Sequence, residues 1–481
     1  MEKNGGDGVN IFQRLKEKSL ATVDQDFYRR IEDWDSWYRG DVKGFHNFQI
    51  FTGQGHVRCR RFTMNMGKKV AQDWANLLMN EKVSITLEGT KEQAFFDQVC
   101  EDNNFAVKIN EMQELKAGLG TAAYVCRITE ASLDPDTSRV QSGGSLRLDY
   151  VTAPHIFPLS WENGRASECA FTSCPTVEGE KYLYLQAHRK GPDGLYIIEN
   201  SIFRNNSGEL TEVPLASVKG YEAVAPRVKT YMSQPLFVLD RLNIVNNVDE
   251  TLPMGVPAFA NAIDQLKAVD ISFDSYVNEF VLGKKRIMVK PAAVRTLDGD
   301  PVFDANDVVF YVLPEDTVGE SIITPIDMSL RVADHNAGMQ DMLNALGSNC
   351  GFGENHYQYD RGSVTTATQI VSENSTLFRT IKKHEIILEE TLTQLARTIL
   401  RLGNKLYGMG LNEEVEISID FDDSIIEDKQ SDFSHDMQLL NAGIMNDWEF
   451  RMKWMNEDEA TARKMLPKME DMTEDQQNEV E

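Results

Sequence analysis

The strongest pattern in the chain is a row of apolar residues at every seventh position between Pro257 and Gly283. The row consists of Phe259, Leu266, Phe273 and Phe280. A companion row consists of Val256, Ile263 and Val277. Such spacing predicts one unbroken helix, about 40 Å long at 1.5 Å per residue. Asp270 interrupts the companion row. The apolar side needs a cover, which either other parts of this chain or neighbouring copies in a ring would supply.

A second, longer helix is predicted from Thr365 or Thr366, either of which would cap its start, to about Tyr407. Its apolar row is Ile370, Leu377, Ile381, Leu388, Leu392, Leu395, Ile399, Leu402 and Leu406. Roughly forty residues at the helical rise span about 60 Å, far above the usual three turns.

Between these two helices the chain predicts strands and a further helix. Strands are expected at residues 286–290 and 308–313, and a helix is expected from Ile326 to Gly347. The next segment, 349–363, is poor in helical pattern. Its glycines favour a mobile loop, and they are Gly351, Gly353 and Gly362.

The first half of the chain mixes helices and strands. Helices are expected at 24–38, 67–79 and 92–117, a strand at 83–87, and short β-rich runs from 121 to about 245. After the long helix, an acidic strand is expected within 413–428, followed by short helices that carry Trp448 and Trp454. The predicted fold class is therefore α+β.

Composition narrows the class of protein. The 481 residues are 41% hydrophobic and 26% charged, as in ordinary globular proteins. No apolar run reaches the roughly 18 residues of a membrane span, and the first residues lack the apolar core of a secretory signal, so we expect no membrane partner. The net charge of −26 argues against tight, sequence-blind wrapping of nucleic acid. The same negative charge is compatible with a protein that lets DNA slide past it, and equally with a need to keep a large assembly soluble.

No catalytic pattern is evident, and we expect neither an enzyme nor a cofactor. The six cysteines form no C-x-x-C pair, and the chain has no phosphate-binding loop and no G-x-S-x-G motif. Asp420, Asp422 and Asp423 resemble a cation site superficially, but they lack the glycine and the final glutamate of an EF-hand loop. We expect no metal site, and a metal-dependent nuclease remains the less favoured alternative.

Three runs of the sequence resemble portal proteins of tailed bacteriophages, in particular those of long-tailed phages that infect Gram-positive bacteria. The runs are residues 253–270 together with 274–280, residues 365–375, and residues 68–78. Each run is a weak indication by itself, but in combination they are specific. The resemblance extends over nearly the whole chain, and the order of the elements agrees with the family. Another virion component, such as a tail or connector protein, remains an alternative.

The resemblance implies a division of the chain into the family's regions. These would be an N-terminal wing at 1–255, stem helices at 256–282 and 326–348, a clip at 283–325, a tunnel loop at 349–364, the long wing helix and acidic strand at 365–428, and a crown with an acidic tail at 429–481.

The resemblance also implies a function. The family forms a ring of twelve copies at one capsid vertex, through which double-stranded DNA is packaged and ejected. Implied partners are the terminase large subunit, the head-completion or adaptor protein, and the major capsid and scaffold proteins. The protein would be part of the virion and would be assembled in the cytoplasm of the bacterial host.

Three groups of residues are candidates for this function. In the tunnel loop they are His356, Tyr357, Gln358, Tyr359 and Arg361, which could touch DNA or pack between subunits. At the clip border they are Lys284, Lys285, Arg286 and Lys290, which could lie near DNA or complement the dipole of a helix C-terminus. For subunit packing in the stem they are Phe259, Ile263, Leu266, Phe273, Val277 and Phe280.

Overall fold

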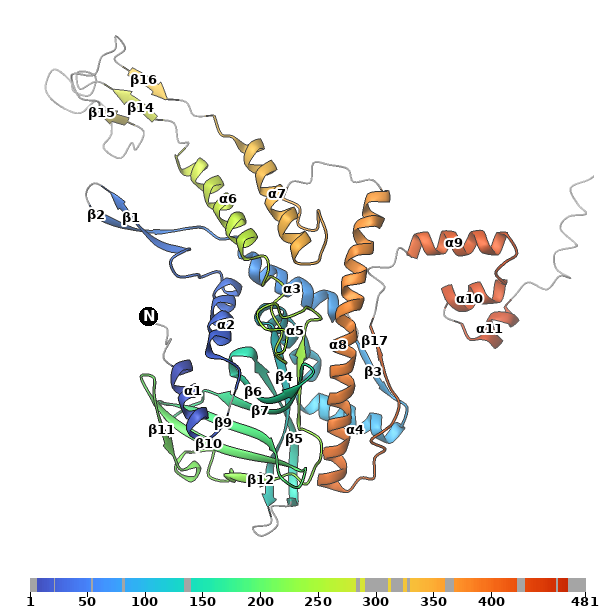
Figure 1. The fold of residues 1–481 in the computed structure, drawn as a ribbon. Helices are drawn as coiled ribbons and strands as arrows, with labels where there is room; N and C mark the ends of the chain where they lie inside the picture. Colours follow the sequence, from blue (N-terminus) through green and yellow to red (C-terminus); the bar gives the residue numbers. More distant parts are fainter. Residues whose placement is uncertain are drawn as a thin grey trace, which may run out of the picture. The chain divides into compact units, whose positions relative to one another are not determined.

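The structure is a computed structural model, shown in Figure 1. It describes residues 7–20, 22–52, 55–79, 83–133, 140–282, 286–289, 310–312, 323–326, 329–359, 367–421, 429–455 and 457–465. The chain divides into two compact units, Met1–Phe421 and Asp422–Glu481, which are described separately.

Five helices form the N-terminal part of the first unit. They are α1 (Asp7–Glu17), α2 (Gln25–Tyr38), α3 (Met66–Leu78), α4 (Thr90–Asp102) and α5 (Phe105–Leu119). The predicted helices at 24–38 and 67–79 are confirmed as α2 and α3. The single helix predicted at 92–117 is wrong, because the chain turns between α4 and α5, where Asn104 has a φ of +50°. Asparagine tolerates this left-handed conformation better than most residues.

Antiparallel sheets fill the region between α5 and α6. The larger sheet has seven strands, with the order β11-β10-β9-β7-β6, β12 beside β10 and β8 beside β9. Its strands are β6 (Ile156–Glu162), β7 (Arg165–Ser173), β8 (Thr176–Val177), β9 (Glu180–Lys190), β10 (Tyr196–Asn206), β11 (Glu209–Val213) and β12 (Arg227–Lys229). The smaller sheet has the order β13-β4-β5, formed by β13 (Phe237–Arg241), β4 (Thr121–Leu133) and β5 (Val140–Thr152).

A buried polar cluster joins α5 to the smaller sheet. Lys116 of α5 donates from Nζ to Asp240 of β13 at 3.0 Å, and both side chains are almost fully buried. Gln113 Nε2 and the Tyr124 hydroxyl also donate to Asp240, at 2.7 and 3.4 Å. Burial lowers the pKa of Lys116, although the attraction of Asp240 opposes this shift. The cluster fixes the helix on the sheet at the centre of the unit.

The three central helices carry the predicted apolar rows. They are α6 (Ile263–Leu282), α7 (Val332–Asn349) and α8 (Ala367–Tyr407). The very long helix is confirmed as α8, and its row is buried from Ile381 to Leu402 against this chain's own elements, which include α3, α4 and β13. The start predicted for the first helix at Pro257 is wrong, because residues 258–261 form a turn and α6 begins at Ile263. The start predicted at Ile326 is also wrong, because that residue ends a strand.

Three short strands lie between α6 and α7 in the sequence. They are β14 (Arg286–Val289), β15 (Phe310–Val312) and β16 (Ile323–Ile326). β14 pairs in parallel with β15 and antiparallel with β16. The two predicted strands are thus confirmed over shorter spans, and β16 was missed.

Two further pairs of strands lie outside these sheets. β1 (Asn47–Thr52) and β2 (Gly55–Arg60) form a two-stranded antiparallel hairpin. β17 (Ile417–Asp420) pairs antiparallel with β3 (Ser84–Leu87), so both predicted strands are confirmed and lie side by side.

The second unit contains three short helices, α9 (Lys429–Asn441), α10 (Asp447–Met455) and α11 (Glu459–Lys464). The rings of Phe433, Phe450 and Trp454 pack on one another in tilted and edge-on arrangements, and Trp454 Nε1 donates to Asp436 at 2.9 Å. In the described part of both units, no helix is long and apolar enough to cross a membrane.

Candidate functional site at the base of helix α6

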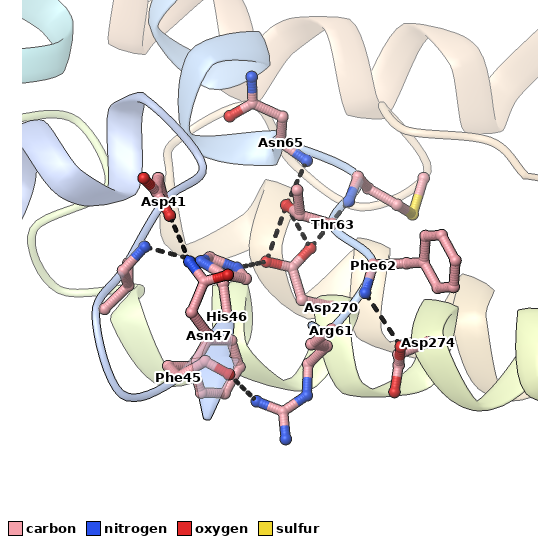
Figure 2. A network of polar contacts seen from close by, with 12 residues as sticks. Asp41, Phe45, His46, Asn47, Arg61, Phe62, Thr63, Asn65, Asp270 and Asp274 are labelled. Carbon is pink, nitrogen blue, oxygen red and sulfur yellow. Dashed lines mark hydrogen bonds and ion pairs between the residues drawn. The ribbon is translucent and has the colours of Figure 1, made fainter. Parts of the chain in front are cut away.

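The carboxylate of Asp270 in α6 lies buried against the segment that connects the β1–β2 hairpin to α3 (Figure 2). It accepts hydrogen bonds from Thr63 Oγ1 at 3.0 Å, from the backbone N–H of Met64 at 2.9 Å and from His46 Nε2 at 2.9 Å. Three donors compensate for the loss of water around a buried carboxylate. The residue that interrupts the apolar row of this helix is therefore its anchor to the N-terminal region.

The ring of His46 has a defined orientation. Its Nδ1 accepts the backbone N–H of Val42 at 2.8 Å, so the proton of the neutral ring resides on Nε2 and points at Asp270. The imidazole is buried beside Trp37 and Phe45, with ring centroids 5.6 and 4.9 Å away. His46 therefore links the turn before β1 directly to α6.

A second carboxylate of α6 holds the other end of this connection. Asp274 Oδ1 accepts the backbone N–H of Phe62 at 2.9 Å. Nearby, Arg61 Nη1 donates to the carbonyl of Phe45 at 2.7 Å, and its guanidinium lies over the rings of Phe45 and Phe48 (Figure 2). The hairpin is thus fastened at its base by side chains one helical turn apart.

Helices α6 and α7 are joined near the far end of α6. Glu279 accepts two hydrogen bonds from the guanidinium of Arg331, at 3.0 and 2.8 Å. These bonds lower the pKa of Glu279 to about 2, and His335 Nε2 lies 3.6 Å from the same carboxylate. Tyr276 packs on His335, with ring centroids 5.3 Å apart.

The six residues predicted to pack between subunits divide into three groups. Phe259 and Leu266 are buried within this chain, and Phe259 lies before the helix. Ile263, Phe273 and Val277 are partly covered. Phe280 leaves 47% of its surface exposed. The first half of the predicted row is therefore covered by the chain itself.

The segment after α7 is a folded turn around Trp74 of α3. Trp74 Nε1 donates to the carbonyl of Cys350 at 3.0 Å, and its ring stacks on Phe352 with a centroid distance of 4.8 Å. His384 of α8 meets the same ring edge-on at 4.8 Å. Gly351 has a φ of +88°, and a Cβ there would lie 3.1 Å from Thr380 and 3.3 Å from Trp74. This glycine therefore serves close packing, whereas the sequence suggested mobility.

The predicted tunnel-loop residues have different surroundings. Tyr357 is buried, and His356 stacks on Phe352 at 4.4 Å. Gln340 of α7 holds the segment by donating to the carbonyl of Tyr357 and accepting from the N–H of Tyr359, both at 2.8 Å. Gln358 is exposed. Arg361 lies outside the described residues.

Three of the four residues of the predicted basic cluster, Lys284, Lys285 and Lys290, lie outside the described residues. Arg286 is the first residue of β14, and its backbone pairs with that of Ile326 in β16. Of the acidic trio, Asp420 ends β17, and Asp422 and Asp423 lie outside the described residues. Among the residues that the structure describes, no group of three or more His, Cys, Asp or Glu side chains is arranged to hold a metal ion.

Sequence reasoning missed His46 and Thr63 as partners of α6. Asp270 itself was visible as a charged residue in an apolar row, which is a sign of a buried polar partner. Nothing in the local pattern identifies that partner, because His46 lies 224 residues away.

Solved structures that resemble the chain include three of low sequence identity. The structure described as "Neck of native GTA particle computed with C12 symmetry" has 11% identity and a TM-score of 0.38, covering 80% of this chain and 88% of that chain. "Virion of native gene transfer agent (GTA) particle" has 11% identity over 80% and 88%, with a TM-score of 0.35. "Neck of empty GTA particle computed with C6 symmetry" has 12% identity over 80% and 87%, also with 0.35. No curated protein matches the chain.

One protein-family model matches almost the entire chain. The family model described as "Phage portal protein, SPP1 Gp6-like" matches residues 17–479, which is nearly the whole chain of 481 residues. The match spans both described units and every helix from α2 onward. The chain belongs to the family of SPP1 Gp6-like phage portal proteins.

Proposed function

We propose that twelve copies of this chain form a ring at one capsid vertex and that double-stranded DNA is packaged and ejected through its central channel. The observation that carries this proposal is the family match over residues 17–479. The family is one of structural proteins, and the proposed role requires no catalysis by this chain. Energy for packaging would come from the ATPase of the terminase large subunit.

The regions of the ring follow the order of the elements. We assign residues 1–255 to the wing, α6 and α7 to the stem, β14 to β16 to the clip, and α9 to α11 to the crown. In this assignment the Asp270 network fastens the stem to the wing, and the Glu279–Arg331 pair holds the two stem helices together. The folded turn at residues 350–359 replaces the first part of the expected tunnel loop.

The proposed DNA path uses the side chains that the single chain leaves accessible. His356 and Gln358 are exposed and Tyr359 is partly covered, so we retain them together with Arg361. We leave Tyr357 out, because its ring is buried. Lys284, Lys285, Arg286 and Lys290 stay candidates at the clip border. A net charge of −26 keeps the total attraction between the chain and the DNA phosphates weak, which supports a channel through which DNA slides.

The proposed partners follow from the portal role. The clip would bind the terminase large subunit first and a head-completion or adaptor protein later, and the wing would contact the major capsid and scaffold proteins. The protein would be assembled in the bacterial cytoplasm and remain in the virion. The run at residues 253–280 supports a source among long-tailed phages of Gram-positive bacteria.

Electron microscopy of the purified protein tests the proposal directly. We expect rings with a central hole, and particles assembled with capsid and scaffold proteins should carry twelve copies at one vertex. A protein that stays a compact monomer at every concentration, also in the presence of scaffold protein, would refute the ring.

A further inference from the structure

The β1–β2 hairpin has one apolar face and one largely basic and polar face. Directly opposite pairs in the antiparallel register share a face. On one face the pairs are Phe48 with Cys59 and Ile50 with Val57; on the other they are Asn47 with Arg60, Gln49 with Arg58 and Phe51 with His56. Such an amphipathic sheet normally lies with its apolar face on a core.

In the described chain the outer half of this apolar face, Ile50 with Val57, is uncovered, whereas Phe48 and Cys59 nearer the base are partly covered. Ile50 is 47% exposed and Val57 is 49% exposed, and Phe51 on the other face is 71% exposed. Among the described residues, the hairpin forms a two-stranded sheet with no third strand. An isolated two-stranded hairpin is marginally stable in water, so a partner surface would complete it.

The hairpin lies within the longest acid-free basic segment of an acidic chain. Residues 42–72 contain no Asp or Glu, whereas the whole chain has 75 acids and a net charge of −26. The cations of the segment are Lys43, Arg58, Arg60, Arg61, Lys68 and Lys69. Arg58 and Arg60 have no ion pair within the described part of the chain and are exposed. The charge of the hairpin therefore complements an acidic surface.

The base of the hairpin is held by hydrogen bonds to α6, although Ile50, Phe51 and Val57 farther along the strands are exposed. His46, on the approach to β1, bonds to Asp270, and Phe62, just after β2, bonds to Asp274. Both carboxylates belong to α6, so the direction of the hairpin is set by that helix (Figure 2). A fixed projection with an apolar, basic surface has the properties of an arm that binds another protein.

From these features we propose that the β1–β2 hairpin is an assembly arm, which docks on the α7 helix of a second copy of this chain. This inference rests on the proposed ring. Asp334, Asp341, Met342 and Ala345 are all exposed and, since 341 and 342 follow 334 by seven and eight residues and precede 345 by four and three, they lie on one side of α7. Its carboxylates match Arg58 and Arg60, and Met342 and Ala345 offer apolar area to Ile50 and Val57.

The composition of the arm favours protein over DNA as the occupant. Contacts to phosphate come from cations and polar groups, which the basic face alone would supply. The uncovered apolar face gains nothing from a phosphate backbone, whereas its burial against a protein surface is favourable. The neighbouring copy is also the partner that a ring places beside every arm.

Site-specific crosslinking tests where the arm docks. Ile50→Cys and Met342→Cys are combined in one chain, with Cys59 and Cys174 replaced by serine, and rings are treated with a short bismaleimide. We expect a ladder of crosslinked dimers and higher oligomers that needs both cysteines, because the link joins different copies. Ile50→Cys combined with Val245→Cys is the control, because Val245 lies in another region and, at 72%, is more exposed than Met342 at 37%. Wild-type-like rings that yield no ladder, or a ladder equally strong with the control pair, would overturn the proposal.

Disruption of the apolar face gives a second readout. The double variant Ile50→Asp, Val57→Asp should raise the protein concentration needed for half-assembly by at least about tenfold, since two apolar side chains per interface lose their burial. Val107→Asp on α5 is the control, because Val107 is 52% exposed. The thermal unfolding of the monomer should be unchanged, which separates an assembly defect from misfolding.

The outcomes distinguish the arm from the ring itself. Absence of rings in the wild-type protein refutes the proposed function. Normal ring assembly by the Ile50→Asp, Val57→Asp variant refutes the arm but leaves the portal role standing. A double variant Arg58→Glu, Arg60→Glu that assembles normally and loses only DNA retention would identify DNA as the occupant and likewise overturn the arm.

Discussion

His46 Nε2 lies 2.9 Å from Oδ2 of Asp270, although 224 residues separate them in the sequence. This bond connects the turn before the hairpin to the middle of α6, and it is completed by the N–H of Met64 and the hydroxyl of Thr63. Both partners are buried. The contact therefore defines how the N-terminal region is seated on the helix.

Asp270→Asn tests that contact. The amide would place a donor where an acceptor is needed, opposite His46 Nε2–H or the backbone N–H of Met64. We expect a loss of about 1–3 kcal/mol in the free energy of unfolding, measured by urea denaturation. Asp264→Asn is the control in the same helix, since that side chain is 88% exposed, and it should cost under about 0.5 kcal/mol. Equal stability of the two variants would contradict the role of Asp270.

The Lys116–Asp240 pair predicts a larger effect. Lys116→Met leaves a buried carboxylate without its cation, which should cost about 3–5 kcal/mol. The neutral double variant Lys116→Met, Asp240→Asn should recover part of that loss, because the amide oxygen still accepts from Gln113. Arg29→Ala removes the exposed pair with Asp26 and should cost under about 1 kcal/mol. A double variant as unstable as the single one would show that charge is not the cause.

Gly351 and Gly410 form a matched pair for the folded turn after α7. Both have positive φ, but a Cβ at Gly351 would be crowded by Thr380 and Trp74, whereas Gly410 has open space. Gly410→Ala should cost about 1–2 kcal/mol from backbone strain alone. Gly351→Ala should cost at least about 1 kcal/mol more, seen as a lower midpoint in urea. Equal costs would mean that the turn yields to the methyl group, as a mobile loop would.

Two buried histidines predict a dependence of stability on pH. Burial lowers the pKa of His188 to about 3, and burial followed by the nearby Lys116 lowers that of His384 to about 3, from 6.5. Between pH 6.5 and about pH 3, the two histidines are protonated in the unfolded chain but not in the folded chain. The free energy of unfolding therefore falls as the pH falls below 6.5. At pH 5 each histidine should cost on the order of 2 kcal/mol.

The His188→Leu variant separates one of these contributions. Neither ring nitrogen of His188 has a hydrogen-bond partner, so leucine removes no hydrogen bond. Stability at pH 7 should be retained, and the decrease from pH 6.5 to pH 5 should become shallower by about half. Urea denaturation across this range measures both. An unchanged slope would show that His188 is not a cause of the acid sensitivity.

The DNA path predicts a phenotype for Gln358 and Arg361. Deletion of the whole loop is unsuitable, because it would remove Phe352 and Tyr357 from the packing around Trp74. Gln358→Glu combined with Arg361→Glu should leave ring assembly intact and lower the DNA content of packaged particles, because negative charges repel phosphate. Lys219→Glu, at a 72% exposed side chain in the region assigned to the wing, is the control. Particles of the double variant that fill normally would remove these residues from the path.

The sequence by itself determined the longer helices, several of the strands and the order in which they occur, although it missed β1, β2 and β16. The long helix α8, the pair α6 and α7 and the strands β3 and β17 all follow from local periodicity. Periodicity identifies the face of an element that needs cover, and it depends only on neighbouring residues. It also showed Asp270 as an exception within an apolar row.

Only the tertiary structure decided what covers each face. It buried Phe259 and Leu266 within the chain, drew Tyr357 into a folded turn, and brought His46 to Asp270. These outcomes depend on contacts between distant segments, whose pairing is set by the shape and polarity of the whole core. The same structure leaves Ile50 and Val57 of the hairpin exposed, because no described element of the same copy packs on them.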